Sequence, residues 1–145
     1  MQNIPNIPQA VAVIHGNNNT IGGTVRFYRR GKCVLISADI NGLTQNNTGF
    51  YGFHIHEGES CGGEGFSDSQ GHYNPNGTTH PLHAGDLPPL MLCGKIAHLE
   101  VLSDRFSLDD IIGKTVIIHS DADDLTSQPA GNAGVKIACG IIRKI

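Results

Sequence analysis

The amino-acid sequence predicts an all-β protein, an antiparallel Greek-key β-sandwich or flattened barrel with two long functional loops. Short runs rich in Val, Ile and aromatic residues alternate between apolar and polar positions, which is the period of a half-buried strand. Asn and Gly clusters separate the runs, and the chain of 145 residues contains 19 glycines. No segment carries the apolar stripe of a long helix. The length fits a single domain over residues 1–145.

Seven segments are predicted to form strands: 9–15, 23–29, 32–40, 50–57, 94–102, 114–119 and 135–142. Turn-forming clusters at 16–19 and 41–42 follow the first and third segments, and a further cluster at 46–49 precedes the fourth. The fourth segment is aromatic, and the last three are rich in Val and Ile. Many short strands separated by turns favour a sandwich or barrel.

Two long segments, 58–92 and 120–134, interrupt this pattern. They contain few strand signals and many Gly, Pro, Asp and His residues. Loops longer than about 12–15 residues in a compact domain usually have a function. We therefore expect the chemistry of the protein to lie in these two loops.

Composition excludes several classes of partner. The chain has 10 Lys and Arg against 13 Asp and Glu, a net charge of −3, which disfavours nucleic acid. No apolar run approaches the roughly 18–20 residues of a membrane helix, so we expect no membrane partner. Residues 1–8 lack the basic and apolar regions of a secretory signal. A cytoplasmic location is the default expectation, with an extracytoplasmic one if a signal was removed.

Seven of the eight histidines lie in the segment from His54 to His119. In a strand, His54 and His56 share one face, whereas Phe53 and Ile55 point to the other, toward a core. Two imidazoles on one face can bind one metal ion. An H-x-H pair alone is weak evidence, since such pairs also occur on solvated strand faces.

A second group lies in the first long loop, which contains His72, His80, His83 and Asp86. Three histidines and one carboxylate can form a closed zinc site, although a polar surface loop is the alternative. His119 ends a strand and, taken alone, favours a structural role. Four nitrogen ligands suit Cu(II). Two four-ligand sites would require one shared imidazole, which spacing alone does not show.

Several motifs in order resemble the copper/zinc superoxide dismutase family. Residues 52–57 (GFHIHE) look like the family's G-F-H-x-H-E strand, and residues 71–75 (GHYNP) look like its bridging-histidine segment. Residues 83–87 (HAGDL) resemble the end of its zinc loop, and segments 112–119, 122–125 and 131–140 resemble its remaining signatures. The likeness runs from about Ala10 to Ile142.

The resemblance implies dismutation of superoxide to dioxygen and hydrogen peroxide, by redox cycling of a histidine-ligated copper ion beside a structural zinc ion. It assigns copper to His54, His56, His72 and His119, and zinc to His72, His80, His83 and Asp86. His72 would bridge the two metals and carry a proton when copper is reduced. Asp123 matches an aspartate that links a copper-ligating histidine to a zinc-ligating one; without the motif it would be read as a solvated acid.

The resemblance also implies a disulfide between Cys61 and Cys139, which would tie the first long loop to the last strand. Cys33 and Cys93 lie in or beside predicted strands. Because free cysteines are among the most buried residues, we expect both to be core thiols. His15 and His98 match no ligand motif and are expected on strand surfaces or in turns.

Lys136 occupies the position of a family arginine, three residues before the final cysteine. There it would draw superoxide toward copper; the alternative is an ordinary exposed strand lysine. Lysine keeps the charge but lacks the planar fork of arginine, so we expect a lower activity than an arginine would give.

Two other functions compete with an active dismutase. One is a copper/zinc-binding relative with little turnover, used for metal delivery or storage; retention of all four copper ligands favours the enzyme. The other is an adhesion-type sandwich with incidental histidines. The oligomeric state, a homodimer included, stays open.

Overall fold

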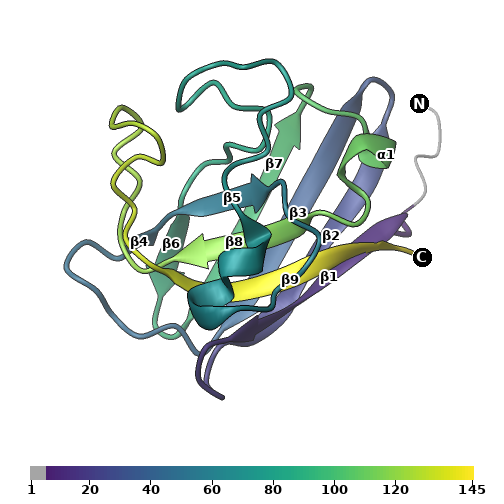
Figure 1. Ribbon diagram of the computed structural model, residues 1–145. Coiled ribbons are helices and arrows are strands. Elements are labelled where there is room, and N and C mark those ends of the chain that lie inside the picture. Colours follow the sequence, from purple (N-terminus) through teal and green to yellow (C-terminus); the bar gives the residue numbers. More distant parts are fainter. Residues whose placement is uncertain (1–5) are drawn as a thin grey trace.

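The computed structural model describes residues 6–145 and contains a single antiparallel sheet of nine strands (Figure 1). The strands are β1 (Ala10–Gly16), β2 (Gly22–Arg30), β3 (Cys33–Asn41), β4 (Phe50–Tyr51), β5 (Phe53–His56), β6 (Leu90–Cys93), β7 (Ile96–Ser103), β8 (Thr115–His119) and β9 (Lys136–Lys144). Two short helices, η1 (Glu64–Ser69) and α1 (Leu108–Ile111), account for the helical residues described. The predicted all-β class is confirmed.

The sheet is a nearly closed Greek-key barrel. Its strands follow the order β4-β6-β7-β3-β2-β1-β9-β8-β5, and each neighbouring pair is antiparallel. Strands β3 and β4 follow each other in sequence, but β7 and β6 lie between them in the sheet. The two end strands, β4 and β5, flank Gly52 in sequence. The chain itself therefore joins the two ends of the sheet at this glycine.

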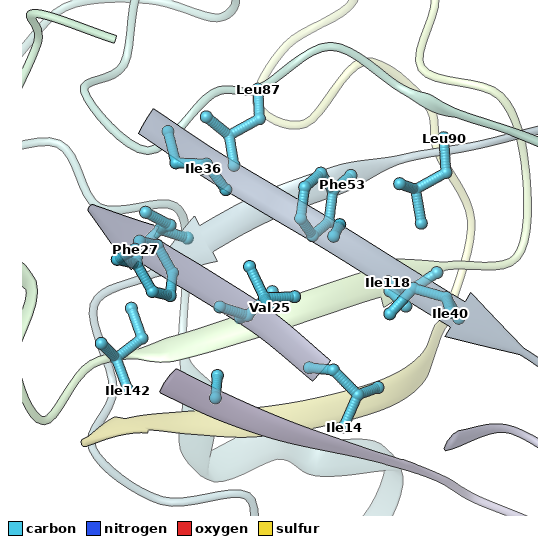
Figure 2. Close-up of a cluster of buried hydrophobic side chains, with 14 of the residues drawn as sticks. Ile14, Val25, Phe27, Ile36, Ile40, Phe53, Leu87, Leu90, Ile118 and Ile142 are labelled. Carbon is cyan, nitrogen blue, oxygen red and sulfur yellow. The ribbon is translucent and has the colours of Figure 1, made fainter. Parts of the chain in front are cut away.

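The core lies inside the barrel and follows the alternation of the strands. On β1, Ala10, Ala12 and Ile14 are buried, whereas Val13 and His15 are exposed. Figure 2 shows side chains from several strands meeting in one cluster, with Phe27 of β2, Ile36 of β3 and Phe53 of β5 among them. Because Phe53 and Ile55 of β5 and Ile118 of β8 point into this core, the alternate side chains of both strands point away from it.

The observed strands differ from the predicted ones in two places. The predicted strand at 50–57 is divided into β4 and β5 at Gly52, because the chain changes from one end of the sheet to the other there. Strand β6 falls at the end of the segment predicted as a loop. Strand β6 has only four residues, directly after Pro88 and Pro89, which is too short a run for its alternation to stand out in the sequence. It pairs with two residues of β4 and two of β7.

Helices play a small part, as predicted. In α1 the backbone N–H of Ser107, which precedes the helix, donates to Asp110 Oδ2 at 2.9 Å. No helix among residues 6–145 is long and apolar enough to cross a membrane.

The disulfide joins Cys61 to Cys139, which are 78 positions apart in sequence and whose Cα atoms are 5.8 Å apart. Closing a loop of this size can stabilise a fold by roughly 4–5 kcal/mol in the chain-entropy model. Cys33 and Cys93 are free, as predicted, but the prediction that both lie in the core is wrong. Cys33 is half-buried and Cys93 is exposed, because both stand at strand ends beside hairpin turns.

The core packing leads to a stability prediction. Phe27 is fully buried, at 0% exposure, whereas Phe50 is 39% exposed. Phe27→Ala should lower the free energy of unfolding by about 3–5 kcal/mol, since it leaves a cavity in the barrel. Phe50→Ala should cost clearly less. Equilibrium urea unfolding of the metal-free, disulfide-bonded protein measures both, and equal losses would contradict this account of the core.

Candidate metal centre

Four histidines converge at one end of the barrel wall. His54 and His56 lie on β5, His119 ends the neighbouring strand β8, and His72 follows η1 in the first long loop. All four side chains are buried, and one ring nitrogen of each lies within 4.8 Å of the others. His56 Nε2 and His119 Nε2 are 3.2 Å apart. We call this set the four-histidine cluster.

The first long loop reaches this cluster by covering the open edge of β5. Residue pairs His54–Asp86 and His56–His72 form isolated antiparallel bridges. Between them, the N–H of Ile55 donates to the carbonyl of Gly85 at 2.8 Å, and the Ile55 carbonyl accepts from the N–H of Tyr73 at 2.9 Å. The loop thus satisfies the backbone of an end strand and brings its own histidines against it.

Gly85 is required for this close approach. A Cβ atom at this position would lie 2.2 Å from the carbonyl oxygen of Ile55. Any larger residue would push the loop from the strand edge.

A second cluster forms within the loop, from His72, His80, His83 and Asp86. His72 Nδ1 lies 2.7 Å from Asp86 Oδ1 and 3.3 Å from His83 Nδ1. His80 Nδ1 is 3.0 Å from Asp86 Oδ2 but makes no hydrogen bond with it. We call this set the histidine–aspartate cluster. Three nitrogens and one carboxylate oxygen match the donors of a closed tetrahedral site.

His72 belongs to both clusters. Its Nδ1 atom faces the histidine–aspartate cluster, whereas its Nε2 atom is buried and has no hydrogen-bond partner. Its ring centroid lies 4.1 Å from that of His54 and 4.9 Å from that of His56. One imidazole therefore stands between the two ligand sets.

The two clusters fit metal ions, because three buried ring nitrogens have no hydrogen-bond partner within residues 6–145: His54 Nδ1, His72 Nε2 and His80 Nδ1. Leaving a buried polar atom without a hydrogen bond costs about 1–3 kcal/mol. Three such nitrogens close together therefore indicate a place where a ligand binds. In most histidines of the two clusters, the ring nitrogen that points away from the cluster lies within hydrogen-bond distance of an oxygen atom. His56 Nδ1 is 2.8 Å from the Gln70 carbonyl, and His119 Nδ1 is 3.3 Å from that of Gly134.

Asp123 links the two clusters through hydrogen bonds from imidazoles. Its Oδ2 accepts from His54 Nε2 and its Oδ1 from His80 Nε2, each at 2.7 Å. Burial alone would raise the pKa of Asp123, but the hydrogen bonds from His54 and His80 hold it well below its usual value. The three residues also converge closely enough to be considered a third site. We read them as a tautomer-fixing link, because both carboxylate oxygens are occupied by ring N–H groups.

Gly131 packs directly against the hydrogen bond between Asp123 and His80. Its φ angle is +71°, and a Cβ atom there would lie 1.9 Å from Asp123 Oδ1 and 2.7 Å from His80 Nε2. The second long loop can cover the carboxylate only with glycine at this point.

Burial favours the neutral, metal-binding form of three imidazoles in the four-histidine cluster, those of His54, His56 and His119. It lowers the pKa of His54 and of His56, and it lowers the pKa of His119 to about 3. Their lone pairs are therefore free at neutral pH, because no proton competes for them.

Two residues that sequence reasoning missed hold the loop histidines by their backbone. Gln128 Nε2 donates to the carbonyl of His80 at 2.6 Å, and Gln128 Oε1 accepts from the His80 N–H at 2.9 Å. Arg105 Nη1 donates to the carbonyls of Pro81 at 2.7 Å and His83 at 3.2 Å. No sequence signal identifies them, since each acts on backbone atoms of a distant segment.

A cavity of about 670 Å³ opens onto the four-histidine cluster. His56, His72 and His119 line its interior with Lys136, which stands at the start of β9. Pro129, Ala130 and Val135 also line it. His15 and His98, expected outside the site, are exposed on β1 and β7 as predicted.

The sequence of the chain matches the family model of copper/zinc superoxide dismutases over residues 21–142. The chain belongs to the copper/zinc superoxide dismutase family. It is 33% identical to an extracellular superoxide dismutase [Cu-Zn] of Brugia pahangi, over 92% of this chain and 74% of that protein. It is 35% identical to superoxide dismutase [Cu-Zn] 2 of Aquifex aeolicus, over 93% and 86% respectively. A superoxide dismutase [Cu-Zn] of Paramecium bursaria Chlorella virus 1 is 33% identical, over 97% and 80%.

Family membership makes the chain an oxidoreductase of the superoxide dismutase class. The family implies copper and zinc as cofactors, and the chain has two clusters with suitable donors. The Greek-key barrel and the Cys61–Cys139 disulfide agree with this membership.

The Asp123 link leads to a prediction about metal affinity. Asp123→Asn keeps the shape of the side chain, but its amide nitrogen cannot accept a hydrogen bond from the second imidazole. Zinc affinity should fall by about 10–100-fold, the usual effect of losing such an outer contact. Competition with a zinc chelator measures the change.

Asp124→Asn is the matched control. In the part of the chain that the structure describes, the hydrogen bonds of the Asp124 side chain stay within its own turn, to Thr126 and Ser127. Its replacement should leave zinc affinity nearly unchanged. Equal losses in the two variants would contradict a specific role of Asp123.

Proposed function

We propose that the chain dismutates superoxide with copper in the four-histidine cluster and zinc in the histidine–aspartate cluster. The observation that carries this proposal is the position of His72, with Nδ1 in one cluster and an unpartnered, buried Nε2 beside the other. Four nitrogen donors suit copper, and a closed set of three nitrogens and one oxygen suits zinc. The names of the relatives, each a Cu-Zn enzyme, support the same assignment.

Copper, when bound, supplies the one-electron exchange: two superoxide anions and two protons yield one dioxygen and one hydrogen peroxide. The residues of the chain supply binding, orientation and protons. His72 can hold a proton at Nε2 while its Nδ1 stays in the histidine–aspartate cluster. Asp123 fixes which nitrogens of His54 and His80 carry hydrogen, so that the opposite nitrogens face the metals.

Lys136 supplies the positive charge that an anionic substrate needs. The chain as a whole carries a net charge of −3, so attraction of superoxide depends on local charge in the cavity. Lys136 lines the cavity together with His56, His72 and His119. Its position supports a role as the guide and docking cation for superoxide.

The shared histidine can be tested by metal titration. His72→Ala should weaken both the copper and the zinc site, because it removes a donor from each. His56→Ala should weaken copper alone, and His83→Ala should weaken zinc alone. Isothermal titration of each metal-free variant, with the disulfide intact, measures the two affinities. An effect of His72→Ala on only one metal would contradict the bridging role.

The charge of Lys136 can be tested by the salt dependence of the reaction. Lys136→Met should lower the rate constant for superoxide by about tenfold or more and flatten its decline with ionic strength, since the steering charge is lost. Lys136→Arg should raise the rate, because a guanidinium offers two parallel donors to the anion. Pulse radiolysis at several salt concentrations gives both quantities.

Lys144→Met is the control for the change in net charge. Lys144 is exposed at the far end of the same strand and does not line the cavity. If both methionine variants lose rate equally, Lys136 is not the guide. Copper and zinc bound in full with negligible turnover would instead favour metal delivery or storage.

A further inference from the structure

The ammonium group of Lys136 is held by two close acceptors at the end of η1. Its Nζ atom lies 2.7 Å from Ser69 Oγ and 2.7 Å from the carbonyl oxygen of Gln70. The Phe66 carbonyl is more distant, at 3.5 Å. A lysine side chain is a flexible stem with a compact charge, so two short contacts to one ammonium restrain it strongly.

The Ser69 hydroxyl is oriented to accept. The side chain of Ser69 is fully buried, and its Oγ donates its own proton to the carbonyl of Phe66 at 2.7 Å. The hydroxyl lone pairs therefore remain for Lys136. The Ser69 backbone is also held, because its carbonyl accepts from the N–H of Gly58 at 2.8 Å.

The second acceptor connects the lysine to the four-histidine cluster. The Gln70 carbonyl accepts from Lys136 Nζ and lies 2.8 Å from His56 Nδ1. Gln70 has a φ angle of +60°, a conformation uncommon outside glycine, and its carbonyl serves both partners from there. The ammonium is thus tied to the same backbone oxygen as a proposed copper ligand.

We infer that Ser69 is a positioning residue, whose buried hydroxyl holds the Lys136 ammonium at a fixed point in the cavity. This inference rests on the proposed function, because the position of Lys136 matters only if it docks superoxide. An ammonium has three protons. Ser69 and Gln70 accept two of them at 2.7 Å, and the only other acceptor among residues 6–145 is the Phe66 carbonyl at 3.5 Å, a contact weak enough for an anion to compete for the third. A lysine so held can dock superoxide without the preset geometry of a guanidinium.

Kinetics separate position from charge. Ser69→Ala removes one acceptor but leaves the charge, so the rate constant should fall by about fivefold at every ionic strength, less than the ~100-fold that a 1 Å misplacement can cost, because the Gln70 carbonyl still holds the ammonium. Lys136→Met should both lower the rate and flatten its salt dependence. The double variant should be no slower than Lys136→Met alone, because the serine acts through the lysine.

Two further variants control for packing. Ser67→Ala alters an exposed serine of the same helix whose hydroxyl is not among the acceptors of the Lys136 ammonium within residues 6–145, and it should lower the rate much less than Ser69→Ala does. Ser69→Cys fills the buried site with a weaker acceptor and should reproduce most of the loss. Metal analysis of each variant confirms equal copper and zinc content before rates are compared.

Nuclear magnetic resonance supplies a readout without turnover. In the zinc-loaded protein, the hydrogen-bonded ammonium protons of Lys136 should exchange slowly enough to give a visible ¹⁵N-correlated signal. That signal should be lost in Ser69→Ala and retained in Ser67→Ala. Retention in Ser69→Ala, or an equal loss of rate from Ser69→Ala in the Lys136→Met background, would overturn the inference. If Lys136→Met alone leaves rate and salt dependence unchanged, the guiding role of Lys136 fails, and the signal still decides whether Ser69 holds the lysine.

Discussion

A single imidazole shared by two buried clusters of potential metal ligands is the constraint on which the rest of this structure depends. His72 lies in a long loop, yet one of its nitrogens must face donors from β5 and β8 while the other faces donors of its own loop. Both requirements are met only if the loop stays in register with β5. The backbone bridges along the β5 edge provide that register, and the close approach at Gly85 allows it.

The surrounding elements hold that arrangement from several sides. Asp123 in the second long loop bonds an imidazole of each cluster, and Gly131 lets the same loop close over it. Gln128 and Arg105 hold the backbone of the loop histidines. The bonds of Asp123 and Arg105 involve a charged group. Gln128 uses both the oxygen and the nitrogen of its amide. Such bonds fix the direction of a contact as well as its distance. The ring nitrogens of both clusters are therefore held in defined directions by other residues of the chain.

The disulfide and η1 extend the same organisation to the cavity. Cys61 precedes η1 and is bonded to Cys139 of β9, the strand that also carries Lys136. Figure 1 shows η1 lying against β9. The segment that supplies the acceptors for the ammonium is therefore fastened to the strand that supplies the ammonium. The disulfide and these contacts connect the Lys136 ammonium, the cavity and the four-histidine cluster.

The sequence by itself determined the fold class, most strands and the candidate ligands, because alternation and motif order are local properties of the chain. It also indicated that His54 and His56 share a face. Only the tertiary structure decided that strand 50–57 breaks at Gly52, that Cys93 lies on the surface, and that Ser69, Gln128 and Arg105 support the site. These features depend on contacts between segments far apart in sequence, often to backbone atoms, which leave no pattern in the residues themselves.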